Sequence, residues 1–146
     1  MGQGGEINVG QLVRERHQEQ TVLIGFSTYV GTVTAAADWD APAERKRVRP
    51  ALEESYESIF HNAGPGRFML DLRDEKLEPL RARRLERAIG VVYRPESERF
   101  SHYFHADLPA QFDAILHFDK TRAVEPLGRT GWQKDQEAPE TFPSGI

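Results

Sequence analysis

The fold class is decided by the stretch Thr21-Val22-Leu23-Ile24-Gly25-Phe26-Ser27, a short run of apolar and β-branched residues between polar flanks. Such a run is typical of a strand that is covered on both faces. We therefore expect residues 21–27 to form the central, parallel strand of a sheet. Gly31 interrupts the pattern, and Thr32 to Ala36 is predicted to be a second short extended segment that can fold back on the first.

Two helices are predicted on either side of a charged segment. The first runs from Val9 to His17, because its apolar residues recur at helical spacing and Asn8 can cap its start. The second runs from a cap at Ser55 to about Asn62, and Gly64 ends it. Residues 38–50, between the two, are rich in arginine and hold two prolines, so we expect an exposed loop.

Three further strands are expected at Arg67 to Leu72, Arg87 to Tyr93 and Phe112 to Phe118, with a short helix from Leu80 to Arg87. Strands separated by helical segments predict an α/β layer with a mostly parallel sheet and flanking helices. The predicted helices are too few to cover both faces of such a sheet. One sheet face is therefore expected to lie uncovered, and the fold to be incomplete.

Composition excludes several classes of protein. Only 38% of the 146 residues are hydrophobic and 29% are charged, which predicts a thin core. A net charge of −4 argues against a nucleic-acid partner. The lack of cysteine excludes disulfides and thiolate zinc sites, and indicates a cytoplasmic protein. No apolar run reaches the ~18 residues of a membrane span, so no membrane association is expected.

Gly25-Phe26-Ser27-Thr28-Tyr29 is close to the G-x-S-x-G elbow of serine hydrolases. The strained elbow needs a second glycine, and Tyr29 stands in its place. A structural serine is therefore favoured over a nucleophile. Asp71 and Asp119 lie near the ends of predicted strands, where carboxylates can serve acid–base chemistry or merely cap helices and pair with arginine.

The five histidines do not predict a metal site. His102 and His105 could share a metal ion only on a helix, because a spacing of three on a strand sends them to opposite faces. His17 and His61 stand near helix ends, where a cation is stabilised, and His117 alternates with apolar neighbours as a core residue does. We predict no metal and no cofactor.

Several stretches together are more specific than any single motif. They are Met1-Gly2-Gln3-Gly4-Gly5-Glu6-Ile7-Asn8-Val9-Gly10-Gln11-Leu12, Val22-Leu23-Ile24-Gly25-Phe26-Ser27-Thr28-Tyr29, Gly31-Thr32-Val33-Thr34-Ala35-Ala36, Arg87-Ala88-Ile89-Gly90-Val91-Val92-Tyr93-Arg94-Pro95-Glu96, Ser101-His102-Tyr103-Phe104-His105, Gln111-Phe112-Asp113-Ala114 and Thr121-Arg122-Ala123-Val124-Glu125-Pro126-Leu127. In order and spacing this set resembles the C-terminal region of erythromycin-esterase-like proteins. The resemblance implies a domain part at residues 1–127. The prolines, glycines and scattered charges between Glu125 and Ile146 predict that residues 128–146 are a flexible, disordered tail.

The resemblance implies a metal-independent hydrolase of carboxylic esters, in some members the macrolactone of erythromycin. In that family a histidine activates water while a glutamate supports it. The H-N-x-H segment that carries one histidine precedes the stretch matching Met1-Gly2, and the other catalytic residues lie further upstream. The resemblance therefore assigns no catalytic residue to this chain, which we expect to be a piece of a longer protein and inactive alone.

Five residues remain candidates for a substrate cleft that holds a small-molecule ester or macrolide: Thr28, Tyr29, His102, Tyr103 and His105. Packing and surface polarity explain them equally well. The alternative function is a stand-alone, non-catalytic binding or oligomerisation domain that forms a homodimer through the uncovered sheet face.

Overall fold

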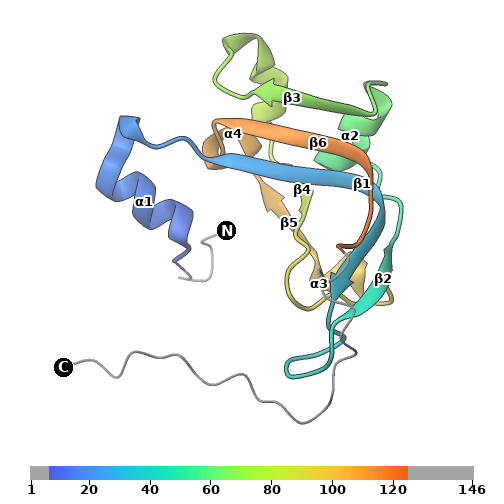
Figure 1. The fold of residues 1–146 in the computed structure, drawn as a ribbon. Helices are drawn as coiled ribbons and strands as arrows, with labels where there is room; N and C mark the ends of the chain where they lie inside the picture. Colours follow the sequence, from blue (N-terminus) through green and yellow to red (C-terminus); the bar gives the residue numbers. More distant parts are fainter. Residues whose placement is uncertain (1–6, 125–146) are drawn as a thin grey trace, which may run out of the picture.

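The computed structural model describes residues 7–124, which form one mixed sheet with helices against it and a second, two-stranded sheet (Figure 1). The helical elements are α1 (Val9–His17), η1 (Gln18–Gln20), α2 (Tyr56–Asn62), η2 (Glu75–Arg81), α3 (Glu98–Ser101) and α4 (Leu108–Gln111). The strands are β1 (Ile24–Ala35), β2 (Glu44–Val48), β3 (Arg67–Asp71), β4 (Arg84–Arg87), β5 (Tyr103–Ala106) and β6 (Ala114–Thr121). The predicted tail at 128–146 lies outside the described residues.

The main sheet has the strand order β2-β1-β6-β3, and the second sheet is the antiparallel pair β4-β5. The α/β class with flanking helices is confirmed. The pairing, however, is mixed: β1 and β6 are parallel at the centre, whereas β2 and β3 pair antiparallel at the edges. Parallel neighbours need a long crossover connection. The short segment between β1 and β2 allows only an antiparallel return.

β1 is one continuous strand of 12 residues, so the predicted break and fold-back at Gly31 is wrong. Gly31 has φ 146° and pairs with Thr121 of β6, and a Cβ atom there would collide with the Thr121 backbone. The glycine permits close approach to β6 and makes no turn. The predicted loop at 38–50 contains β2, whose residues pair with the second half of β1.

The two predicted helices are confirmed with their caps. The Asn8 side chain accepts a hydrogen bond from the Gln11 N–H at 2.9 Å, and the Ser55 hydroxyl accepts one from the Ser58 N–H at 3.2 Å. The strands predicted at 67–72 and 112–118 are confirmed as β3 and β6.

Two predictions between these elements are wrong. The helix expected from Leu80 to Arg87 is replaced by η2, which contains Pro79 and ends at Arg81, and by β4. The strand expected from Arg87 to Tyr93 does not form, because β4 ends at Arg87. Within residues 88–93 the structure has an isolated bridge between Ala36 and Val92. Pro79 lies inside η2, which is a 3-10 helix, and the residues that follow are extended because they pair with β5.

One face of the main sheet packs on α2 and holds the core. Tyr56 and Phe60 of α2 meet Ile115 of β6, with Leu72 and Leu108 completing the cluster. The Tyr56 hydroxyl also accepts a hydrogen bond from the Leu108 N–H at 3.2 Å, so α2 is fixed to α4 as well as to the sheet.

The other face of the sheet is apolar and is not covered by any helix or strand between residues 7 and 124. Its exposed side chains are Ile24 (47%), Phe26 (73%), Met69 (67%) and Phe118 (39%), which we call the open face. The register places Phe26 and Met69 on either side of Leu116, so these strands share one apolar surface. The prediction that residues 21–27 are covered on both faces is therefore wrong.

Candidate functional site

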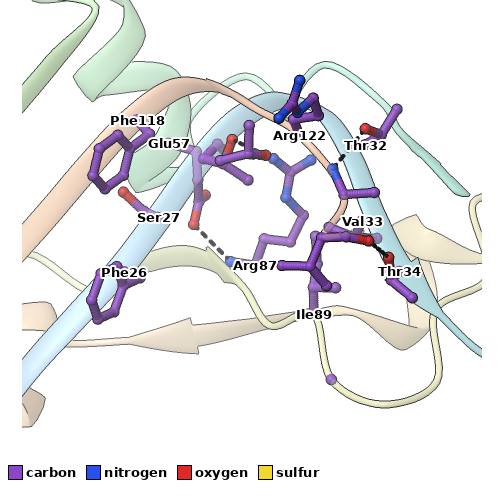
Figure 2. A pocket seen from close by; sticks show the side chains of 15 residues that line it. Phe26, Ser27, Thr32, Val33, Thr34, Glu57, Arg87, Ile89, Phe118 and Arg122 are labelled. Atoms are coloured by element: carbon purple, nitrogen blue, oxygen red, sulfur yellow. Dashed lines mark hydrogen bonds between the residues drawn. The ribbon is translucent and has the colours of Figure 1, made fainter. Parts of the chain in front are cut away.

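A pocket of about 380 Å³ lies beside β1, between the end of β6 and the segment that follows β4 (Figure 2). Hydroxyl groups, apolar side chains and charged groups all contribute to its lining. The lining residues are Phe26, Ser27, Thr28, Thr32, Val33, Thr34, Glu57, Arg87, Ile89, Gly90, Phe118, Thr121, Arg122, Ala123 and Val124. The pocket lies toward the C-terminal halves of the parallel strands β1 and β6, where α/β sheets place ligands.

Arg87 fastens the pocket wall to the rest of the fold. Its guanidinium donates to the backbone carbonyls of Thr28, of Tyr29 at 3.0 Å and of Arg49 at 2.8 Å. Its charge is balanced by Glu98, 2.9 Å away, in an ion pair whose side chains are 1% and 5% exposed. A buried cation with these acceptors holds β1, the segment that follows β2, and α3 in fixed positions.

Glu57, the second residue of α2, carries the buried carboxyl of the pocket. Its Oε1 atom accepts a hydrogen bond from the Arg87 N–H at 3.0 Å. Its Oε2 atom is fully buried without a hydrogen-bond partner among the described residues. Burial raises the pKa of Glu57, and the Arg87 N–H, the Glu57 N–H, the Arg87 charge and the nearby Ser55 hydroxyl partly oppose that shift. The Oε2 atom can therefore accept one more hydrogen bond when the carboxyl is ionised, or donate one when it is protonated.

A line of polar side chains leads from the pocket through the helix-covered face of the sheet. The Ser27 hydroxyl lies 2.9 Å from Nδ1 of His117, which is wholly buried. Burial lowers the pKa of His117, so its ring is neutral at pH 7. His117 Nε2 lies 3.6 Å from Asp119 Oδ1 and has no hydrogen-bond partner in the described chain. Without that bond, the Ser27–His117–Asp119 set lacks the geometry of a catalytic triad.

Asp119 instead pairs with a second histidine. His61 Nδ1 lies 2.6 Å from Asp119 Oδ1, and the His61 ring stacks flat on Tyr29 with centroids 3.8 Å apart. Both side chains remain partly exposed. This pair is outside the pocket lining and ties the end of α2 to β1 and β6, so packing alone accounts for it.

The structure brings three of the five candidate cleft residues to Arg87 and leaves two apart. Thr28 lines the pocket, and its hydroxyl lies 3.1 Å from that of Thr121. Tyr29 gives its carbonyl to Arg87, and the Arg87 guanidinium lies 5.9 Å from the centre of the Tyr103 ring. His102 binds the Arg94 N–H and the Ala88 carbonyl, and His105 is exposed on β5.

Sequence reasoning missed Glu57 and Arg87, the two charged residues that organise the pocket. Glu57 sits in the first turn of a capped helix, where an exposed acid is the ordinary expectation. Arg87 stands at the border of two predicted elements. At neither position does the surrounding sequence contain a pattern that predicts a buried charged side chain.

Two general features of the described chain also bear on function. Within residues 7–124, every helix is too short or too polar to cross a bilayer. The same part of the chain does not gather three or more potential metal-binding side chains into one site.

Comparison with known proteins gives one family and two similar structures. The family model for erythromycin esterase matches residues 1–121. A succinoglycan biosynthesis protein of known structure is 26% identical with a TM-score of 0.65, over 80% of this chain and 28% of that one. A Bacillus cereus protein is 21% identical with a TM-score of 0.65, over 77% and 28%, which shows likeness of fold. The chain thus spans about 28% of the length of each structure.

Proposed function

From the premise that the chain belongs to the erythromycin esterase family, we propose that it forms the C-terminal part of a carboxylic-ester hydrolase and builds one wall of the substrate cleft. In this proposal the catalytic histidine and glutamate come from an upstream part of the hydrolase, and the chain alone does not hydrolyse esters. The substrate is a small-molecule ester or a macrolide, and the setting is the cytoplasm.

The open face is the observation that supports this proposal most strongly. Apolar surface in water is unfavourable by about 25 cal/mol per Å², and contiguous apolar patches usually mark a contact with other protein. Here the patch spans three neighbouring strands, β1, β6 and β3. Helices on both faces are the usual arrangement around parallel strands. An upstream part of the hydrolase supplies the missing layer.

Helix α1 adds a second exposed apolar surface. Val9 and Leu12 are largely exposed, and no residue of α1 is buried. The helix is held to the sheet by Arg14, which pairs with Asp113 and donates to the Thr21 carbonyl at 3.1 Å. Figure 1 shows α1 beside the start of β1, away from the sheet. An upstream layer would meet this helix as well as the open face.

The test joins the chain to the upstream region of a family member and measures hydrolysis of p-nitrophenyl acetate and a macrolactone. The joined protein is expected to hydrolyse at least one ester, whereas the separate chain matches buffer. Met69→Lys places a charge on the open face and is expected to lower the rate of the joined protein at least tenfold. Val91→Lys, at a side chain 72% exposed outside that face, is the matched control. Equal rates for these two variants would remove the open face from the proposal.

The same face favours a second candidate function, a stand-alone association domain. Two copies could cover each other's open faces, because a twofold dimer contact joins the same patch on both chains. Sedimentation of the purified chain decides between the two. A monodisperse dimer that Met69→Lys converts to monomer, and Val91→Lys does not, supports the association domain; a monomer at all concentrations excludes it.

A further inference from the structure

The pocket beside β1 contains one buried oxygen atom, Oε2 of Glu57, that lacks a hydrogen-bond partner among the described residues. Glu57 is 2% exposed, and its Oε2 atom has no hydrogen bond to any described residue. Figure 2 shows its side chain ending between Ser27 and Arg87. An unsatisfied buried oxygen is costly, so a ligand that completes its hydrogen bonding gains binding energy.

The chemistry of that ligand is narrowed by the carboxyl itself. A carboxylate needs a donor, and a protonated carboxyl can also donate. An ammonium group only donates and so pairs with the carboxylate, whereas a carbonyl only accepts and so pairs with the proton of the neutral carboxyl. A hydroxyl group satisfies both, because it donates and accepts.

The adjacent wall offers further hydroxyl groups. The Thr28 and Thr121 hydroxyls lie 3.1 Å apart, and Thr28 also lies 3.2 Å from the Val30 carbonyl oxygen, to which it can donate. Each threonine hydroxyl has one proton and two acceptor positions. The pair therefore keeps acceptor capacity for hydroxyl groups of a ligand.

Charge in the pocket disfavours a strongly ionic ligand. Arg87 is already neutralised by Glu98 and engaged with three backbone carbonyls. Among the lining residues this leaves Glu57 and Arg122, of opposite sign, as the remaining ionisable groups. Phe26 and Phe118 stand at the same pocket and offer apolar surface to the carbon–hydrogen face of a ring.

From these features we propose that the pocket binds a neutral, polyhydroxylated ring, such as a glycosyl group, with Glu57, Thr28 and Thr121 as its polar contacts. The volume of about 380 Å³ falls in the range of small-molecule sites. This proposal goes beyond ester hydrolysis, since it concerns binding and its three polar contacts all belong to this chain.

The experiment titrates the full chain with methyl glucoside and follows backbone amide shifts by NMR. Glucosamine and glucuronate, one cationic and one anionic, are the matched probes of the same ring. We expect methyl glucoside to bind with a dissociation constant of about 1 mM and to shift the amides of Thr28, Thr121 and Ile89. Both charged probes are expected to bind at least about fivefold more weakly.

Three variants test the contacts. Thr28→Val and Glu57→Met approximately keep the side-chain shape, remove the polar atoms that face the ligand, and are expected to weaken methyl glucoside binding at least about fivefold. Thr21→Val also removes a buried hydroxyl, one that lies outside the pocket and 3.3 Å from the Val13 carbonyl, and should bind like the parent chain.

Absence of amide shifts with methyl glucoside, tighter binding of either charged probe, or equal affinity in all three variants would overturn the proposal. None of these results depends on ester turnover. Failure here is therefore separate from failure of the proposed hydrolase function.

Discussion

Replacing Glu98 with alanine leaves the Arg87 guanidinium buried without its counter-charge, and we expect a large loss of stability. The two side chains are 5% and 1% exposed and lie 2.9 Å apart. Removing one partner of such a pair typically costs about 3–5 kcal/mol, because the remaining charge stays desolvated. The whole folded state of a small domain is worth only about 5–15 kcal/mol.

A matched surface pair provides the reference. Arg94 Nη2 lies 2.9 Å from Asp38 Oδ1, the same separation, but these side chains are 48% and 66% exposed. Exposed pairs contribute about 0–1 kcal/mol, so Asp38→Ala should change little. The comparison isolates burial, since the distance is equal.

Urea unfolding followed by circular dichroism measures both variants. Glu98→Ala is expected to lower the free energy of unfolding by about 3 kcal/mol or more, and Glu98→Gln, which keeps an acceptor for Arg87, by less. Should Glu98→Ala be too unstable to fold, Glu98→Gln carries the comparison. If neither Glu98 variant loses more stability than Asp38→Ala, the idea that this ion pair anchors the pocket wall is refuted.

Three other perturbations have defined outcomes. Burial, followed by the charge of Glu57, raises the pKa of Glu86 from 4.5 to about 7, so the stability that neutral Glu86 contributes is complete below pH 4.5 and is lost as the pH rises through 7. Urea titrations should therefore show Glu86→Gln gaining stability relative to the parent chain between pH 5 and pH 8. A difference in stability that stays constant over this range would contradict the prediction. Gly31→Ala drives a Cβ atom into the Thr121 backbone and should lower the free energy of unfolding by about 3 kcal/mol or more. Gly90→Ala has open space at its Cβ atom and should stay within about 1 kcal/mol of the parent chain in thermal melts. Equal losses of stability would disprove the close approach of Gly31 to β6. Arg14→Ala should speed amide hydrogen exchange across α1 without changing exchange in β6, because the Arg14–Asp113 ion pair holds the exposed helix α1 to the sheet. Unchanged exchange in α1 would show that other contacts hold this helix.

Local signals predicted the elements that carry them. Asn8 and Ser55 are strong caps, and the helices that follow begin where those side chains bind backbone N–H groups. The apolar run at 21–27 identified the central strand. The interpretation failed at Gly31, because a glycine that admits a neighbouring backbone looks in sequence the same as one that makes a turn.

Tertiary pairing accounts for the remaining differences. β2 consists of four charged residues, Glu44 to Arg47, followed by Val48, and it is extended because the second half of β1 pairs with it. The pocket could not be predicted either. Its key contact joins Glu57 to the Arg87 backbone across 30 positions of sequence, and such a contact leaves no local pattern.

The decisive test of the proposal that this chain lacks a catalytic base is a rate measurement. It follows the cleavage of p-nitrophenyl acetate by the purified 146-residue chain. Because the hydrolytic base is proposed to come from upstream, we expect a rate equal to that of buffer, with His61→Ala indistinguishable from the parent chain. A rate well above buffer that disappears in His61→Ala would contradict it, since the His61–Asp119 pair would then be a working base within this chain.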